Sequence, residues 1–153
     1  MTRVFLTELP EYVRGVYTRL ASLPEKEAAT VVWLVGDLGA GKTTFVQQFA
    51  KEFGVLDDIQ SPTYVLMKTY DIPESHAQVG NRWFKRLVHI DAYRLTGAEE
   101  FWALKPERFL QDPGALVLVE WPSQVAGALP TPDVSITFSS EKAGEKERYI
   151  EVV

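Results

Sequence analysis

The residues most able to do chemistry stand in a glycine-rich run at residues 36–43, GDLGAGKT, which has the spacing G-x-x-x-x-G-K-[ST]. Glycines let successive backbone N–H groups turn toward an anion. The Lys42 ammonium can reach the β- and γ-phosphates, and the Thr43 hydroxyl is a ligand for Mg²⁺. The run therefore predicts a phosphate loop that binds a nucleoside triphosphate with Mg²⁺. The expected contacts come from Gly39, Ala40, Gly41, Lys42, Thr43 and Thr44.

The segments on either side of this phosphate loop must hold it in place. Residues 31–35 form a Val-rich apolar run that is typical of a buried strand. Downstream, a phenylalanine at every fourth position falls on one face of a helix predicted over residues 42–53, and Gly54 suits its C-cap. A helix N-terminus adds a positive dipole that favours the same anion. A strand, this loop and a helix in succession are the context in which the spacing binds phosphate.

Two acids end β-prone segments further along the chain. Glu120 closes the apolar run at residues 115–119, and Asp91 closes the segment at residues 83–90. Such a carboxylate lies at the sheet edge where ligands bind in open α/β folds. Glu120 is thus a candidate to touch the metal, and Asp91 to position water or share the metal. An exposed strand-end acid and a loop-capping Asp are the alternatives. Alternation puts His89 on the face of Asp91, where a structural role is commoner.

Three further residues are candidates with an ordinary alternative each. Thr63, in the Ser-Pro-Thr sequence beyond the loop helix, could lie near the γ-phosphate as in P-loop switches, or belong to a simple turn. Trp121 follows Glu120 and could pack on the nucleotide, although a single Trp more often fills a core. Arg94 could act on the phosphates, although a salt bridge is the commoner fate of a lone Arg.

The remaining pattern predicts an α/β fold. A strand is expected at residues 3–6 and a helix at residues 9–23. Residues 63–70 and 83–90 could pair as an antiparallel hairpin around a polar connection. The other expected elements are a broken helical stretch at 96–110 and late strands at 134–138 and 149–153. The sequence thus predicts one P-loop NTPase-like domain over residues 1–153, with a mixed parallel and antiparallel central sheet flanked by helices.

Composition narrows the function classes. The chain has 153 residues, a net charge of −5 and no cysteine. An acidic balance argues against nucleic-acid binding by this chain alone, because phosphate neutralisation dominates such binding. Without cysteine there is no disulfide, thiolate metal site or cysteine nucleophile. No apolar run is long enough for a signal peptide or a membrane span. We therefore expect a cytoplasmic protein with no membrane contact.

Four segments in this order, GDLGAGKTT, SPTY, HIDAYRL and VEWP, resemble the TsaE family, formerly YjeE. This family is the small bacterial ATPase of tRNA threonylcarbamoyladenosine (t6A) biosynthesis. The resemblance implies that Thr43 and Glu120 hold Mg²⁺ and that Asp91 lies near the γ-phosphate and is needed, with Lys42, for hydrolysis of ATP. It also implies a switch-like loop at residues 61–64. Two further residues, Trp121 and Arg148, are implied to lie near the nucleotide.

The resemblance further implies a protein partner, the TsaB–TsaD complex, which carries out the transfer to tRNA, so that tRNA would be met only indirectly. The chain departs from the family in two places: residues 98–106 lack a usual glycine, and the connection at residues 72–83 is longer. We expect both departures to mark a diverged partner surface rather than a changed active site. Two other functions stay open on the residues alone: a small kinase that phosphorylates a metabolite, and a nucleotide-gated binding module.

Overall fold

A computed structural model describes residues 1–59, 66–141, 144 and 146–153. Its strands are β1 (Thr2–Phe5), β2 (Thr30–Val35), β3 (Met67–Asp71), β4 (Gln78–Val79), β5 (Arg82–Trp83), β6 (Arg86–Asp91), β7 (Ala115–Glu120), β8 (Val134–Ser139) and β9 (Glu147–Val152). Its helices are α1 (Leu9–Ala21), α2 (Lys42–Glu52), α3 (Glu74–Ala77), α4 (Ala98–Ala103), α5 (Glu107–Leu110) and the 3₁₀ turn η1 (Pro122–Val125).

Seven of the strands form one mixed sheet in the order β1-β9-β8-β2-β7-β6-β3. The four central strands β8, β2, β7 and β6 run parallel. Strand β3 pairs antiparallel with β6 on one side, and on the other side β9 pairs antiparallel with β8 and β1 pairs antiparallel with β9. Strands β4 and β5 form a separate hairpin. The predicted α/β fold with a mixed sheet is therefore confirmed. Because β2, β6 and β7 are parallel neighbours, their C-terminal ends meet at one sheet edge.

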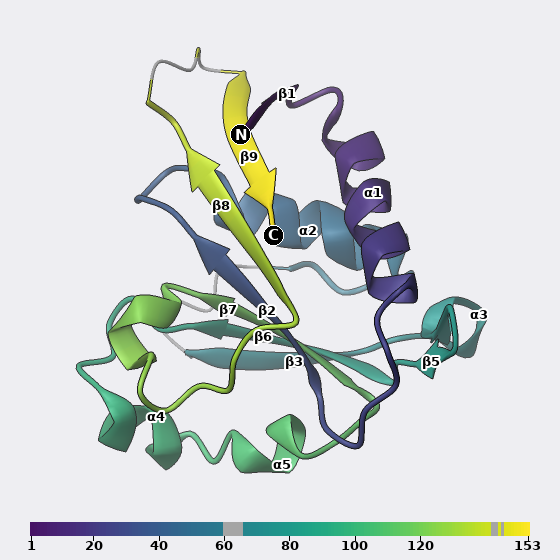
Figure 1. Cartoon of the computed structure of the whole chain (residues 1–153), viewed down its shortest axis with the longest axis vertical. Helices are drawn as coiled ribbons and strands as arrows, with labels where there is room; N and C mark the ends of the chain where they lie inside the picture. Colours follow the sequence, from purple (N-terminus) through teal and green to yellow (C-terminus); the bar gives the residue numbers. More distant parts are fainter. Residues whose placement is uncertain (60–65, 142–143, 145) are drawn as a thin grey trace.

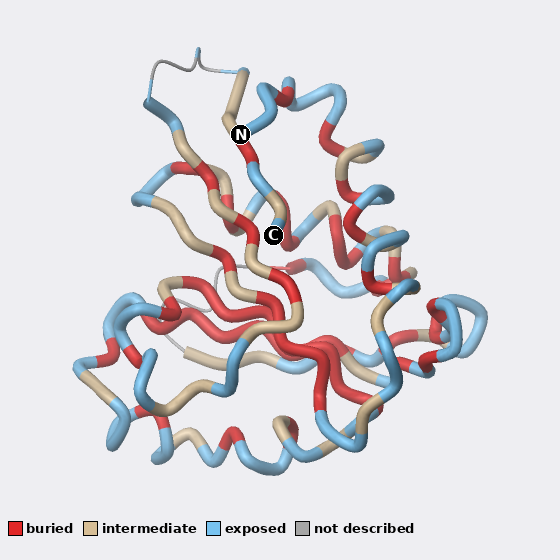
Figure 2. The backbone as a smooth tube through the Cα atoms, in the orientation of Figure 1, coloured by how far each residue is buried: buried red, intermediate tan, exposed pale blue. Residues whose placement is uncertain are grey.

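Helices cover both faces of this sheet (Figure 1). Helices α1 and α2 pack on one face against residues such as Leu34, Leu116 and Leu118. Helices α4 and α5 lie on the other, against Val117 and Val119. Alternate residues of the buried strand β7 thus serve opposite cores, which explains why this strand is an unbroken apolar run. Figure 2 shows this burial concentrated in the central strands.

The antiparallel pair predicted from the two β-prone segments is present, but one boundary is wrong. Strand β3 pairs with β6 as expected. The expected strand at residues 83–90, however, begins only at Arg86, and Trp83 belongs to the small hairpin β4–β5. Phe84 diverts the chain, since its backbone N–H bonds to the carbonyl of Ala77 and its side chain is fully buried. Other expected elements lie within a few residues of their predicted bounds, including the break between α4 and α5.

Within the described residues, the longest and most apolar helices still fall short of what is needed to cross a membrane.

The turn of the small hairpin generates a prediction about stability. Gly80 has φ +61°, and a Cβ there would lie 2.3 Å from the carbonyl oxygen of Ala21 at the end of α1. We expect Gly80→Ala to lower the free energy of unfolding by about 1–3 kcal/mol, the usual cost of such strain. Gly15→Ala is the matched control, because a Cβ at this exposed position inside α1 would meet nothing within 4 Å. It should raise the free energy of unfolding by about 0.5–1 kcal/mol.

Urea unfolding followed by circular dichroism measures both variants. Equal stability of Gly80→Ala and the parent chain would contradict the close contact between the hairpin turn and α1.

Candidate functional site

The phosphate loop joins the end of β2 to the start of α2. Gly41 is the N-cap of α2 and has φ +99°, a conformation that residues with a Cβ rarely adopt. The helix leaves its first N–H groups without helical partners, and they open on the loop. The backbone N–H of Ala40 donates to the carbonyl of Asp37 at 3.1 Å, which tightens the turn. The loop therefore has the backbone shape and the dipole of an anion site.

Lys42 lies inside this loop with only 4% of its surface exposed. Its Nζ donates to the carbonyl oxygens of Gly36 at 2.7 Å and Asp37 at 2.8 Å. Burial lowers the pKa of the Lys42 ammonium, and the carboxylates of Glu120, Asp91 and Asp37 oppose that shift. A cation that is stripped of water in this way gains from the arrival of an anion.

The side chains of Thr43, His89 and Glu120 meet at one atom. Glu120 Oε1 accepts the Thr43 hydroxyl at 3.0 Å and lies 2.8 Å from His89 Nε2. The lone pairs of the Thr43 oxygen stay available, because the hydroxyl acts as the donor in its hydrogen bond to the carboxylate. Hydroxyl and carboxylate oxygens are the hard ligands that Mg²⁺ prefers. Thr43 and Glu120 therefore fit the metal that the sequence predicts.

Asp91 ends β6 next to Glu120, its partner in the parallel register of β6 and β7. Its side chain is 5% exposed, and Oδ1 accepts the backbone N–H of Tyr93 at 3.0 Å. The loop-capping role weighed from the sequence is thus present. Asp91 also lines the same hollow as Lys42 and Glu120, so the cap holds a carboxylate at the site.

Trp121 sits in a left-handed conformation, with φ +56°, directly after Glu120. Strained backbone of this kind tends to occur at functional sites. Its indole centroid lies 4.3 Å from Lys42 Nζ and 4.9 Å from the ring of Tyr93. The ring packs partly on the apolar core beneath the sheet and partly lines the hollow. The core-packing role weighed from the sequence is therefore present, and a contact with the nucleotide stays a prediction.

Arg148 reaches the phosphate loop from β9. Its Nη2 donates to the carbonyl of Gly39 at 3.2 Å, and its Nη1 donates to the carbonyl of Glu147 at 2.5 Å. The side chain passes within 3.6 Å of where a Cβ on Gly41 would stand. A guanidinium thus lies across the mouth of the loop, from a strand at the far end of the sequence.

One hollow of about 270 Å³ gathers most of the predicted residues. Its lining consists of Leu38, Gly39, Gly41, Lys42, Thr43, Thr44, Asp91, Tyr93, Glu120, Trp121 and Arg148. Ala40 is buried and is not among these lining residues, and Thr63 lies outside the described residues. A second, apolar hollow of about 140 Å³ adjoins the first, sharing Gly41, Thr44 and Arg148 with it and lined further by Val4, Phe5, Leu6, Leu9, Phe138 and Ile150.

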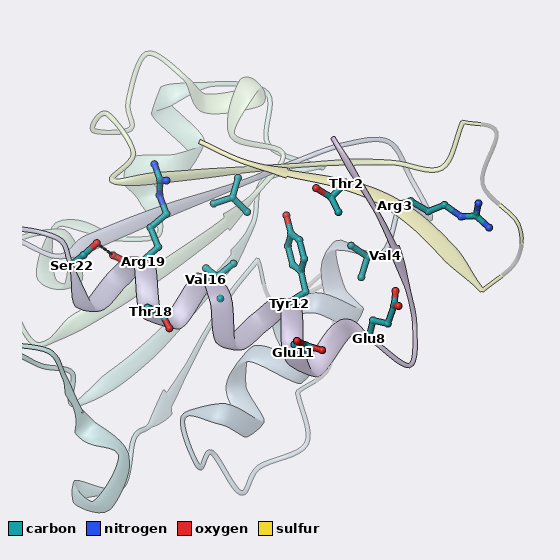
Figure 3. Close-up of a pocket in the computed structure, with 12 residues that line it drawn as sticks. Thr2, Arg3, Val4, Glu8, Glu11, Tyr12, Val16, Thr18, Arg19 and Ser22 are labelled. Carbon is teal, nitrogen blue, oxygen red and sulfur yellow. Dashed lines mark hydrogen bonds between the residues drawn. The ribbon is translucent and has the colours of Figure 1, made fainter.

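A larger groove of about 840 Å³ lies away from the loop, between α1 and the strands β1 and β9. Figure 3 shows Tyr12 and Val16 on the side of α1 that faces the sheet, where β1 carries Thr2 and Val4. Size alone does not make a site. The smaller hollow has a buried cation, two buried carboxylates and a helix N-terminus converging on one point, and we therefore place the chemistry there.

The sequence did not predict two features of this site. His89 was expected to be structural, whereas its Nε2 contacts Glu120. The only advance signal was alternation, which puts His89 on the face of Asp91. The apolar hollow was also missed, because Val4 and Leu9 come from the N-terminal segment and Phe138 from β8. Nothing in their local spacing relates those residues to the loop.

Comparisons with known proteins agree on one family. A model of the family "Threonylcarbamoyl adenosine biosynthesis protein TsaE" matches residues 9–150. The TsaE protein of Treponema pallidum is 34% identical over 121 residues, which are 79% of this chain and 81% of the relative. That of Bacillus subtilis is 34% identical over 120 residues, 78% of this chain and 66% of the relative. The crystal structure of YdiB from Bacillus subtilis aligns with a TM-score of 0.62 at 28% identity. The alignment covers 97% of this chain and 80% of the YdiB chain.

The contact between Lys42 and Trp121 yields an optical prediction. An added triphosphate should draw the Lys42 ammonium away from the indole and change the tryptophan emission, because a nearby cation perturbs the ring. Trp121→Phe should abolish the change. Trp83→Phe is the control, since this Trp stands 55% exposed on the small hairpin. A titration with ATP and Mg²⁺, followed by fluorescence, measures all three proteins.

If the emission change survived in Trp121→Phe, the triphosphate would not be bound where Lys42 and Trp121 meet.

Proposed function

The chain belongs to the TsaE family of threonylcarbamoyl adenosine biosynthesis proteins, and from that premise we propose that it binds ATP with Mg²⁺ at the phosphate loop and hydrolyses it. The observation that carries the proposal is the bond between Thr43 and Glu120. It joins the start of the loop helix to the acid at the end of β7, the pair of oxygen ligands that P-loop enzymes use to hold Mg²⁺.

Each side chain at the site has a proposed part in hydrolysis. Lys42 and the N–H groups at the start of α2 bind the β- and γ-phosphates. Bound Mg²⁺ would be held by Thr43 and Glu120 and would supply charge neutralisation for the phosphates. Asp91 orients the attacking water, because its buried carboxylate is held by the N–H of Tyr93. Arg148 contributes a positive charge at the mouth of the loop.

The base of the nucleotide has a place beside the phosphates. The apolar hollow shares Gly41 and Thr44 with the phosphate hollow and offers a surface on which a planar ring could lie. Apolar linings with few polar groups are usual for such sites. We propose that Val4, Leu9 and Phe138 receive the base there.

The partner is proposed to be the TsaB–TsaD complex, with tRNA met only through it. Relatives of this chain carry the name tRNA threonylcarbamoyladenosine biosynthesis protein TsaE, and the net charge of −5 offers little attraction for free nucleic acid. An arginine supplied by a partner can raise the rate of a P-loop enzyme by about 10³–10⁵-fold. We therefore propose slow hydrolysis by the chain alone, faster hydrolysis with the partner, and action in the cytoplasm.

Two other functions remain to be separated from this one. A metabolite kinase would need arginines on a lid over the site. Residues 96–112 are the candidate segment for such a lid, and Arg108 is the one arginine in their sequence. Its guanidinium packs 4.6 Å from the ring centroid of Phe109, which favours hydrolysis over transfer to a metabolite. A nucleotide-gated binding module would use the same loop without needing turnover.

Removal of the loop cation or the metal ligand tests the proposal. Lys42→Ala and Glu120→Ala should each lower phosphate release from ATP by about 10²-fold or more, because each removes a preorganised charge-stabilising group. Lys51→Ala is the control, since this exposed lysine lies on the same helix away from the loop. Phosphate release is measured with and without TsaB–TsaD. Turnover that neither substitution changes would contradict the proposal, and strict dependence on an added metabolite would favour a kinase.

Asp91→Ala separates an ATPase from a gated module. This variant should bind ATP and the partner but fail to support repeated rounds of tRNA modification, because water is no longer oriented for attack. Gel-shift or mass analysis of the modified tRNA follows the rounds. Repeated rounds at the normal rate would show that hydrolysis is not the purpose of the site.

A further inference from the structure

We infer that His89 is a positioning residue for the metal: its Nε2–H holds the Glu120 carboxylate in the orientation that receives Mg²⁺. The inference rests on the proposed function, since it concerns the same metal.

The contact is built into the sheet. His89 on β6 and Glu120 on β7 belong to adjacent parallel strands and point to the face that α2 covers. His89 Nε2 lies 2.8 Å from Glu120 Oε1, and the two side chains are 0% and 4% exposed. Because both strands are central to the sheet, neither backbone can shift without breaking its ladders. The imidazole is thus a fixed support beside the carboxylate.

The hydrogen bonds assign the proton on the imidazole. Glu120 Oε1 can only accept, so Nε2 carries the hydrogen. Nδ1 is buried and has no hydrogen-bond partner within the part of the chain that the structure describes. A lone pair is the less costly group to leave there, since an unpaired buried N–H would add a donor without an acceptor. The Nε2–H of His89 is therefore the donor that faces Glu120.

The two donors on one oxygen decide what the other oxygen can do. Oε1 receives both the Thr43 hydroxyl and His89, whereas Oε2 has no hydrogen-bond partner among the described residues. Glu120 lines the hollow of the phosphate loop. With Oε1 held from two sides, the carboxylate plane is fixed and Oε2 is left for the metal or for water bound to it. Thr43 alone would leave rotation about this single contact.

A purely structural role explains His89 less well. Its neighbours on this face, Leu87 on β6 and Leu118 on β7, belong to the apolar core. A leucine at position 89 would fill such a place without burying an unpaired nitrogen. The imidazole leaves Nδ1 buried without a hydrogen-bond partner among the described residues, and the hydrogen bond to Glu120 offsets this cost. Hydrogen-bond partners of metal ligands typically change metal affinity by about 10–100-fold when they are removed.

Three substitutions test the inference. His89→Gln can place an amide N–H near the position of Nε2, His89→Asn is polar but one methylene too short to do so, and His89→Leu removes the donor. Calorimetry measures the affinity of each purified protein for ATP in EDTA, and then the Mg²⁺ concentration that half-saturates the tighter, metal-dependent binding. Thermal unfolding of each protein without ligand checks that it is folded.

We expect His89→Leu and His89→Asn to raise the half-saturating Mg²⁺ concentration by about 10–100-fold, with ATP affinity in EDTA unchanged. His89→Gln should restore most of the metal response. If the His89→Leu protein does not fold, the comparison of His89→Asn with His89→Gln decides. An unchanged Mg²⁺ response in a folded variant without the donor overturns the inference, as does an equal loss of ATP affinity with and without metal. A parent chain that bound no ATP under either condition would instead overturn the proposed function itself.

Discussion

The site depends on the burial of one carboxylate. Glu120 is 3% exposed, and a buried charge is tolerated only where donors surround it. The donors come from two different elements, Thr43 on α2 and His89 on β6, and meet at one oxygen. That oxygen therefore fixes the start of the loop helix against two central strands. Thr43 and Glu120 both line the hollow beside the phosphate loop, where their remaining oxygen lone pairs can take a further ligand.

The order of the central strands brings the residues of the site to one edge of the sheet. Strands β2, β7 and β6 are parallel neighbours, so the phosphate loop, Glu120 and Asp91 leave the sheet at the same edge. Apolar cores on both faces bury most residues of these strands and prevent the strands from slipping in register. The antiparallel strand β9 then brings Arg148 back to the loop from the far end of the chain. Rigid central strands and short loops at one edge give a site whose polar groups are positioned before any ligand arrives.

Much of this could be predicted from the sequence, and the reason differs from residue to residue. Lys42 and Thr43 were predictable because glycine spacing and a following helix determine their place locally. Glu120 and Asp91 followed from the rule that strand-end acids gather at one sheet edge. Trp83 was assigned to the wrong strand, because local β-propensity does not reveal that the side chain of Phe84 is buried in the core.

Other features depend on contacts between distant segments. The link from His89 to Glu120 requires β6 and β7 to be neighbours, which no local pattern reveals. Arg148 was a candidate only through family resemblance, since its approach to Gly39 depends on the whole order of strands. Thr63, a candidate for a place near the γ-phosphate or for a simple turn, lies outside the described residues, and its role stays a prediction.

A crystal structure with Mg²⁺ and a non-hydrolysable ATP analogue tests the central claim most directly. The account predicts that the phosphates lie along the start of α2 and that the base lies against Val4 and Phe138. It predicts that the Thr43 hydroxyl binds the metal, and that the Glu120 carboxylate contacts the metal directly or through a metal-bound water. A nucleotide seated in the larger groove beside α1, or a metal away from Thr43 and Glu120, would contradict it.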